Sequence, residues 1–419
     1  MNVFSLSWRY LWSRPLASAL NLLLLTLGLA SMAFVLIAQD QIDHAFERDL
    51  AGIDVVVGAK GSPLQLILAG VFHMDVPPGN VPLAEVQALA AHPQVAQVIP
   101  LSLGDSVAGF RIVGTNADYP AHYGAALAQG ALWSAPMQAV LGAQVAQATG
   151  LPLGQRFTGS HGLGGGGHEH ADMPYTVVGV LAPCACVLDR LVLTDTASVW
   201  NVHEGLAPGE FQSLSAEDRE AIRAEREVTL ALVRYNTPMA AISFPRFINA
   251  TTKMQAAAPA MEITRLLGMV GVGTRVLQGM GAVLLLVAAL SVFIALWSAV
   301  RERRADIAML RLLGAPPWKV GALLLCEALW LALLASALGL LAGQGLTALL
   351  GGLWMADQGL TALLGGLWMA DQGLAIVAWH WPTALAGVPV AALGVALAAA
   401  AVPAVSAYRV DVTSLLQTR

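Results

Sequence analysis

Four long apolar runs divide the chain, at residues 16–38, 276–300, 320–343 and 375–402. An α-helix rises about 1.5 Å per residue, so each run is long enough to cross a hydrocarbon core of roughly 30 Å. The first run is too long for the apolar part of a usual signal peptide, and no clear cleavage site follows it. The pattern therefore predicts a membrane α-helical protein with four transmembrane helices.

The region between the first two runs has a different pattern. Helical patterns at residues 83–91 and 137–149 alternate with short segments that predict strands. These segments are IDVVVG, QVAQVIP, GFRIVGT, YTVVGVL, RLVLTD and VTLALVRY. We expect residues 39–275 to form stalks and a large α+β extracytoplasmic domain, inserted between transmembrane helices 1 and 2.

A stalk is predicted directly after the first run. Ile42, Phe46 and Leu50 recur at a spacing of four residues, which is typical of one face of a helix. The first transmembrane helix is therefore expected to continue beyond the membrane.

Cations cluster in three places, namely the interfacial segment 1–15, the loop 301–319 and the tail 403–419. Positive residues favour the cytoplasmic side of a membrane. With four crossings all three clusters lie on one side, so both termini and the loop are predicted to be cytoplasmic. The large domain and the connection 344–374 are then outside.

The loop 301–319 is amphipathic as well as basic. Ile307, Leu310 and Leu313 fall at helical spacing, and Gly314 followed by two prolines ends the pattern. A solvated cytoplasmic loop explains the charge. A helix on which a cytoplasmic partner docks also explains the spacing.

The outer connection contains a perfect tandem repeat. QGLTALLGGLWMAD at residues 344–357 recurs identically at residues 358–371, which is most simply a duplication of coding sequence. We expect the added copy to lengthen the outer end of the third span or to lie along the outer interface. A glycine pair in each copy argues against one long helix.

Composition narrows the class of protein. Hydrophobic residues make up 57% of the chain and charged residues 12%, which is not typical of a soluble protein. The net charge of −5 does not indicate the basic surface that nucleic-acid binding requires. No GxxxxGK[ST] loop is present, so no directly bound cofactor is expected and ATP hydrolysis, if used, must come from another chain.

A metal site is the main chemical hypothesis. His161, His168 and His170 lie on a glycine-rich stretch of the outer domain, and imidazole suits Zn²⁺, Cu²⁺ or Ni²⁺. The competing interpretation is a flexible, solvated loop. Cys184 and Cys186 are predicted to share one face of a strand, and such a pair is awkwardly placed to bridge to itself, which leaves metal ligation, a redox role or packing.

Two features inside the spans are candidates for function or packing. Glu327 is the acid of the third span, and intramembrane acids are costly and often functional, although an interfacial hydrogen bond also explains it. Gly339 and Gly343 form a small-xxx-small step that lets helices approach closely.

The layout and the motif RERRADIAMLRLLGAPPWKV, followed by ALLLCEAL, resemble the permeases of MacB/FtsX/LolC-type bacterial ABC transporters. The resemblance implies that the motif forms a coupling helix contacted by an ATPase subunit, with ATP and Mg bound by that partner. It implies these coupling residues: Arg304, Ile307, Ala308, Leu310, Arg311, Leu313, Gly314 and Ala315. Glu327 matches an acidic position found early in the third span of the family.

With this resemblance, the chain is predicted to be a non-enzymatic permease subunit in the bacterial inner membrane, in contact with lipid. It is expected to form a homodimer, or else a pseudo-dimer with a related chain. It is expected to couple ATP hydrolysis on a separate chain to motion of the periplasmic domain. The rival hypothesis is an FtsX-like regulatory protein that switches a periplasmic partner or senses a ligand. An enzyme with a catalytic outer domain lacks any supporting motif.

Overall fold

The computed structural model describes residues 3–162, 170–206, 209–302, 309, 311, 314–356 and 379–408. The chain divides into two compact units. The membrane unit comprises Met1–Asp43 and Met269–Arg419. The other unit, the outer domain, is His44–Gly268. Each unit has hydrophobic core clusters of its own.

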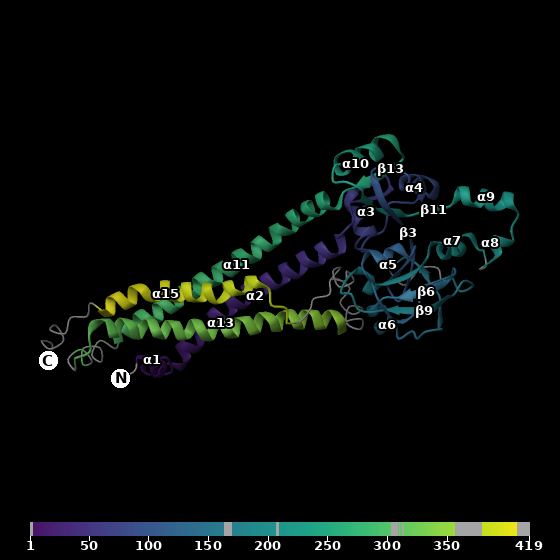
Figure 1. The fold of residues 1–419 in the computed structure, drawn as a ribbon. Helices are drawn as coiled ribbons and strands as arrows, with labels where there is room; N and C mark the ends of the chain where they lie inside the picture. The colour runs from purple at the N-terminus through teal and green to yellow at the C-terminus, as the bar shows by residue number, and fades with distance from the viewer. Residues whose placement is uncertain are drawn as a thin grey trace. The chain divides into compact units, whose positions relative to one another are not determined.

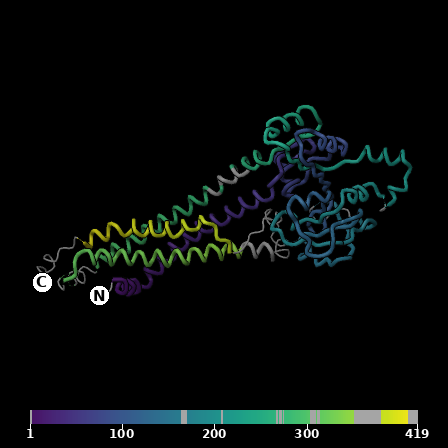
Figure 2. Tube along the Cα trace, viewed as in Figure 1, coloured from purple at the N-terminus to yellow at the C-terminus, as the bar shows by residue number. Residues whose placement is uncertain are grey.

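The first unit is a helical bundle (Figure 1, Figure 2). Its helices, including the parts of two that continue into the second unit, are α1 (Val3–Leu11), α2 (Pro15–Leu50), α11 (Pro259–Glu302), α13 (Pro317–Ala356), η2 (Thr383–Ala386) and α15 (Gly387–Tyr408). Among the described residues, four helical segments are long and apolar enough to cross a membrane, within Pro15–Leu50, Arg275–Glu302, Pro317–Leu349 and Thr383–Tyr408. The predicted fold class is confirmed.

Small residues allow the helices of this bundle to pack closely. A Cβ on Gly339 of α13 would lie 2.7 Å from the Cβ of Leu29 on α2, and one on Gly343 would lie 2.7 Å from the Cβ of Ala33. Both glycines of the predicted step thus lie where α13 approaches α2 too closely for a Cβ atom. Helix α15 runs along α13 (Figure 2). Its buried residues include Ala392, Ala396 and Ala400.

Large apolar side chains cover the outside of the bundle. On α11 the exposed residues include Val283, Leu286, Leu290 and Ile294. An apolar exterior around a helical core is what a bilayer requires, because the helices satisfy their own backbone hydrogen bonds.

The outer connection departs from two expectations. Helix α13 continues through Gly351 and Gly352, so the first glycine pair does not break it. Tertiary packing commonly overrides the low helix propensity of glycine. The last helix begins at Gly387 rather than near residue 375, and the second copy of the repeat, residues 358–371, lies outside the described residues.

The second unit is built around an 11-stranded sheet with the order β13-β1-β12-β3-β4-β10-β6-β9-β5. Strand β7 pairs with β9, β8 pairs with β3, and β11 forms a separate pair with β2. The strands are β1 (Val55–Ala59), β2 (Val81–Pro82), β3 (Val95–Val107), β4 (Phe110–Thr115), β5 (Leu127–Gly130), β6 (Gln138–Leu141), β7 (Arg156–Phe157), β8 (Ser160–His161), β9 (Tyr175–Leu181), β10 (Leu191–Asp195), β11 (Glu227–Val228), β12 (Leu230–Tyr235) and β13 (Met254–Ala257).

Alternation along the strands explains why both faces of the sheet are covered. Val55 and Val57 of β1 belong to one core cluster, whereas Val56 points into another. Figure 1 shows α4 and α10 near β13, on the side of the first cluster. The helices of this unit are α3 (Pro63–Gly70), α4 (Leu83–Ala90), α5 (Asp118–His122), α6 (Ala143–Thr149), η1 (Val187–Arg190), α7 (Thr196–Glu204), α8 (Glu210–Ser213), α9 (Ala216–Glu225) and α10 (Ala240–Thr251).

All six predicted strand segments are strands in the structure, and the helix predicted at residues 83–91 is α4. The helix predicted at residues 137–149 is half wrong. Its first part is strand β6, which pairs with both β10 and β9, and only Ala143–Thr149 is helical. Hydrogen bonding to both β9 and β10 stabilises a strand here, although the local sequence pattern favours a helix.

We expect Gly339→Ala to destabilise the bundle, because the added methyl group meets Leu29 on α2. Overpacking of this kind costs about 1–3 kcal/mol. Gly345→Ala is the matched control on the same helix, since its Cβ would meet nothing within 4 Å. Thermal unfolding of both variants in detergent checks the prediction. Equal midpoints for the two variants would show that α2 and α13 do not pack at Gly339.

Candidate functional site

The segment implied to couple to an ATPase is described only in part. Arg304, Ile307, Ala308, Leu310 and Leu313 lie outside the described residues. Of the remaining implied residues, Gly314 has a φ of 91° and its N–H donates to the carbonyl of Arg311 at 3.0 Å, and Ala315 follows it. A left-handed glycine at this point is a typical helix end.

A polar group lies among the membrane helices around Glu327. The side chain of Glu327 is buried, and it lines a cavity of about 300 Å³ together with Asn21 and Ser291. The hydroxyl of Ser291 on α11 donates to Oδ1 of Asn21 on α2 at 2.6 Å. Sequence reasoning found the acid but missed its two polar neighbours, because a single Asn or Ser in an apolar run carries no distinctive signal.

Asp105 and His161 meet across paired strands of the outer domain. β3 and β8 are antiparallel, and Asp105 is the register partner of His161. Nδ1 of His161 lies 3.0 Å from Oδ1 of Asp105. The aspartate side chain is 5% exposed and the imidazole 44% exposed, so a buried carboxylate lies beneath an accessible ring.

His170 and His203 approach the same point from other elements. The N–H of His170 donates to the carbonyl of Gly159 at 3.0 Å. Its Nε2 lies 3.1 Å from Nε2 of His161 and 3.8 Å from Oδ1 of Asp105. His203, in the last turn of α7, has its ring centroid 5.3 Å from that of His161. Asp105, His161 and His203 each offer one ligand atom, and these atoms lie within 4.8 Å of one another.

A backbone contact fixes the tautomer of His203. Its Nδ1 lies 2.8 Å from the carbonyl oxygen of Val199, one turn earlier in α7. A carbonyl only accepts hydrogen bonds, so Nδ1 carries the hydrogen and Nε2 keeps its lone pair. Imidazole lone pairs and a carboxylate form a donor set suited to transition-metal ions.

The predicted metal residues are therefore only partly brought together. His161 and His170 are in contact, whereas His168 lies outside the described residues. Sequence reasoning missed Asp105 and His203, because no local spacing links them to the histidine-rich stretch. Only the pairing of β3 with β8, and the packing of α7 on β3 and β4, brings them there.

The expectation that the two cysteines cannot bridge to each other is wrong, and so is the hypothesis that they ligate a metal. Cys184 and Cys186 form a disulfide with each other, with Cα atoms 5.1 Å apart. An extended strand would place these atoms about 6.6 Å apart. Ala185 has a φ of 53°, so the chain turns between the cysteines and brings them within disulfide range. Both sulfurs are bonded and unavailable as thiolate ligands.

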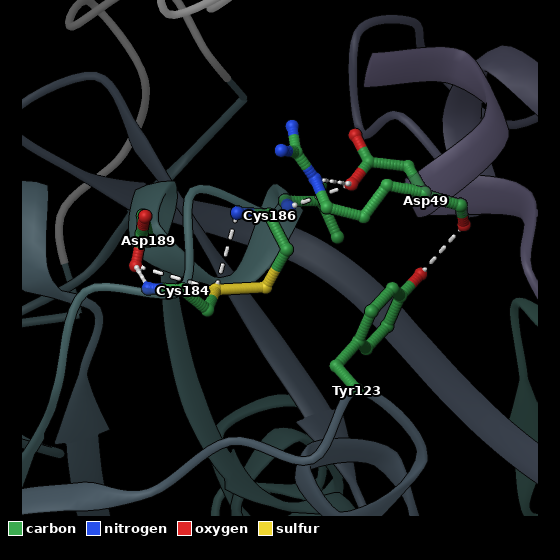
Figure 3. A network of polar contacts seen from close by, with 7 residues as sticks. Asp49, Tyr123, Cys184, Cys186 and Asp189 are labelled. Atoms are coloured by element: carbon green, nitrogen blue, oxygen red, sulfur yellow. Dashed lines mark hydrogen bonds and ion pairs between the residues drawn. A yellow bond between two sulfur atoms is a disulfide. The ribbon is translucent and has the colours of Figure 1, made fainter. Parts of the chain in front are cut away.

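The disulfide loop is joined to the end of α2 by a polar network (Figure 3). The N–H of Cys184 donates to Oδ1 of Asp189 at 3.0 Å. Asp49, next to the last residue of α2, accepts from the N–H of Val187 at 3.1 Å through Oδ1, and its carbonyl accepts from the hydroxyl of Tyr123 at 3.0 Å. Burial raises the pKa of Asp49, although the nearby Arg48 opposes the shift.

Comparison with known proteins identifies both parts of the chain. The family model of the MacB-like periplasmic core domain matches residues 18–200. The family model of the FtsX-like permease C-terminal region matches residues 279–412. The chain belongs to the MacB/FtsX-type ABC transporter permeases.

Curated relatives of this permease are export proteins by name. It is 24% identical over 369 residues to the pyoverdine export ATP-binding/permease protein PvdT of Pseudomonas fluorescens, covering 83% of this chain and 51% of that protein. The Pseudomonas aeruginosa PvdT is 24% identical over 360 residues, covering 83% and 50%. The permease thus spans about half the length of the curated relatives it matches.

Two solved structures are similar to part of the permease. The periplasmic region of MacB from Actinobacillus actinomycetemcomitans matches at 14% identity and a TM-score of 0.34, covering 52% of this chain and 95% of that one. The extracellular domain of the noncanonic ABC-type transporter YknZ from Gram-positive bacteria matches at 13% identity and a TM-score of 0.30, covering 48% and 98%.

The Asp49 carboxyl is expected to make the stability of the outer domain depend on pH. Its folded-state pKa lies above the ordinary value of 3.8, so stability falls as pH rises from about 4 through the folded pKa. Asp49→Asn keeps an acceptor for Val187 and removes this titration. The free energy of unfolding of the variant relative to the native protein should therefore increase with pH.

The difference in unfolding free energy between Asp49→Asn and the native protein is measured by hydrogen exchange of residues 184–190 in the full-length protein, from about pH 4 to pH 7. Asp49→Ala is the matched comparison, since it leaves the buried Val187 N–H without its acceptor, at a cost of about 1–3 kcal/mol. Identical pH profiles for Asp49→Asn and the native protein would contradict the assignment.

Proposed function

We propose that this permease is the membrane-spanning subunit of a bacterial ABC system for export or extraction, in which ATP hydrolysis on a partner chain moves the outer domain. The observation that carries this proposal is the presence of a MacB-like periplasmic core domain and an FtsX-like permease region in one chain. The printed names of the PvdT relatives, which include both ATP binding and permease, support an ATPase as the partner.

The proposed orientation has the segment 303–319 in the cytoplasm of the cell, the outer domain in the periplasm and the spans in the inner membrane. The cation clusters support it. Arg14, before the first span, forms an ion pair with Glu302 at the end of the second. These two ends therefore lie together, as two successive crossings of the membrane require.

The proposed route of force runs along two helices. Helix α2 supplies Leu25 to the core of the membrane unit and Leu50 to the edge of a core in the outer domain. Helix α11 likewise supplies Val292 to the first core and Ile263 to the second. An uninterrupted helix with packed residues at both ends can carry a displacement that begins on its cytoplasmic side.

We also infer a homodimer as the working unit. Two-fold pairs are the commonest closed assembly of identical chains. A homodimer would give each of two ATPase copies one 303–319 segment to bind.

Replacing the coupling residues should uncouple the permease from its ATPase. In the triple variant Arg304→Ala, Leu310→Ala and Arg311→Ala, loss of arginine and leucine anchors is expected to weaken binding of the ATPase about 30-fold or more. Co-purification of the ATPase from detergent measures this binding directly. The permease-dependent rate of ATP hydrolysis in liposomes measures its effect on the ATPase.

The matched control is Arg223→Ala with Arg246→Ala, two arginines exposed on the outer domain. This variant should bind the ATPase as the native chain does. Undiminished binding by the triple variant would refute the docking role of the segment.

A further inference from the structure

The geometry points to a site for one divalent transition-metal ion of the zinc class, formed by Asp105, His161, His170 and His203 of the outer domain. This site is separate from the coupling segment and needs no ATPase. The four residues come from strand β3, strand β8, the turn that precedes β9 and helix α7. Their convergence is a property of the folded domain and not of a histidine-rich sequence.

The spacing of the donor atoms fits such an ion. Bonds of about 2.0–2.1 Å in a tetrahedral site set neighbouring ligand atoms about 3.3 Å apart. With Nδ1 as the ligand atom of His161, Oδ1 of Asp105 lies 3.0 Å from that nitrogen and 3.8 Å from Nε2 of His170. One imidazole gives one nitrogen to an ion, and Nε2 of His161, which lies 3.1 Å from Nε2 of His170, is the alternative ligand atom of that ring.

One carboxylate oxygen of Asp105, Oδ1, is fully buried, yet it accepts no hydrogen bond from any described residue. The nearby Nδ1 of His161 is within ion-pair distance but does not direct a hydrogen at it. An unsatisfied buried acceptor costs about 1–3 kcal/mol, and more when charged. A cation between the aspartate and the imidazoles would remove this cost.

The arrangement around His203 matches that of a metal ligand. Metal-binding histidines commonly donate their second ring N–H to a carbonyl or carboxylate, which fixes the ring. Val199 provides that carbonyl, so Nε2 is left to bind the ion. His203 is exposed and His161 is nearly half exposed, which gives an ion a direct path from solvent.

The imidazole nitrogens and the carboxylate oxygen indicate which class of ion the site would bind. Mg²⁺ and Ca²⁺ prefer oxygen ligands, whereas imidazole nitrogen suits zinc and its neighbours in the transition series. Three imidazoles and one carboxylate would neutralise one of the two charges of the ion. We therefore assign the site to Zn²⁺ or an ion that replaces it, such as Co²⁺.

Titration of the full-length, metal-stripped protein in detergent, carrying no polyhistidine tag, tests the site. Zn²⁺ in competition with a chromogenic chelator should bind at one ion per chain, with a Kd of about 1 μM or tighter. Co²⁺ should give the visible absorption of a four-coordinate site. His203→Ala and Asp105→Asn should each weaken Zn²⁺ binding about 10–100-fold or more and abolish the Co²⁺ spectrum.

Two control variants make the result specific. His92→Ala removes a histidine that packs against Phe244, away from the cluster, and should bind Zn²⁺ normally. His168→Ala should also retain binding, because the proposed ligands are Asp105, His161, His170 and His203. Absence of stoichiometric binding by the native protein would overturn the proposal. Binding that survives His203→Ala and Asp105→Asn, or that depends on His168 alone, would overturn it as well.

Discussion

A bilayer offers no partner for a backbone N–H or C=O, so each segment that crosses it must satisfy these groups internally. The chain meets this constraint with helices, and water cannot drive those helices together inside the membrane. Close packing at small residues stabilises the association of the helices instead. Gly339, Gly343 and the alanines of α15 let backbones approach, while Val283 and Leu286 face outward. Among the polar side chains of these helices, Glu327 and Asn21 are buried and line one cavity.

In the outer domain the apolar side chains are on the inside, because water surrounds it. Its central strands are buried on both faces, and helices cover each side. The backbone groups are satisfied by strand pairing, and side chains at the ends of the strands are therefore available for other roles. Asp105 and His161 are held together by such a pairing, and Asp49 fastens the end of α2 to the loop that follows the disulfide.

Sequence periodicity predicted the membrane helices and the six principal strands, because both are local patterns imposed by one buried face. It failed where a distant partner decided the outcome. Gln138–Leu141 became a strand because β9 and β10 flank it. The cysteine pair formed a disulfide because Ala185 adopts a left-handed conformation that no spacing rule reveals. His203 joined the histidine cluster through the packing of its helix, which is equally invisible in the sequence.

The central claim is that ATP turnover on the cytoplasmic side moves the outer domain. Spin labels at Gln87→Cys, an exposed position on α4, report that motion in a Cys326→Ala background. Double electron–electron resonance would measure the label-to-label distance between two copies in liposomes, with the ATPase present. The account predicts a different distance distribution when the ATPase is trapped with ATP and vanadate than without nucleotide. Identical distributions in the two states would contradict it.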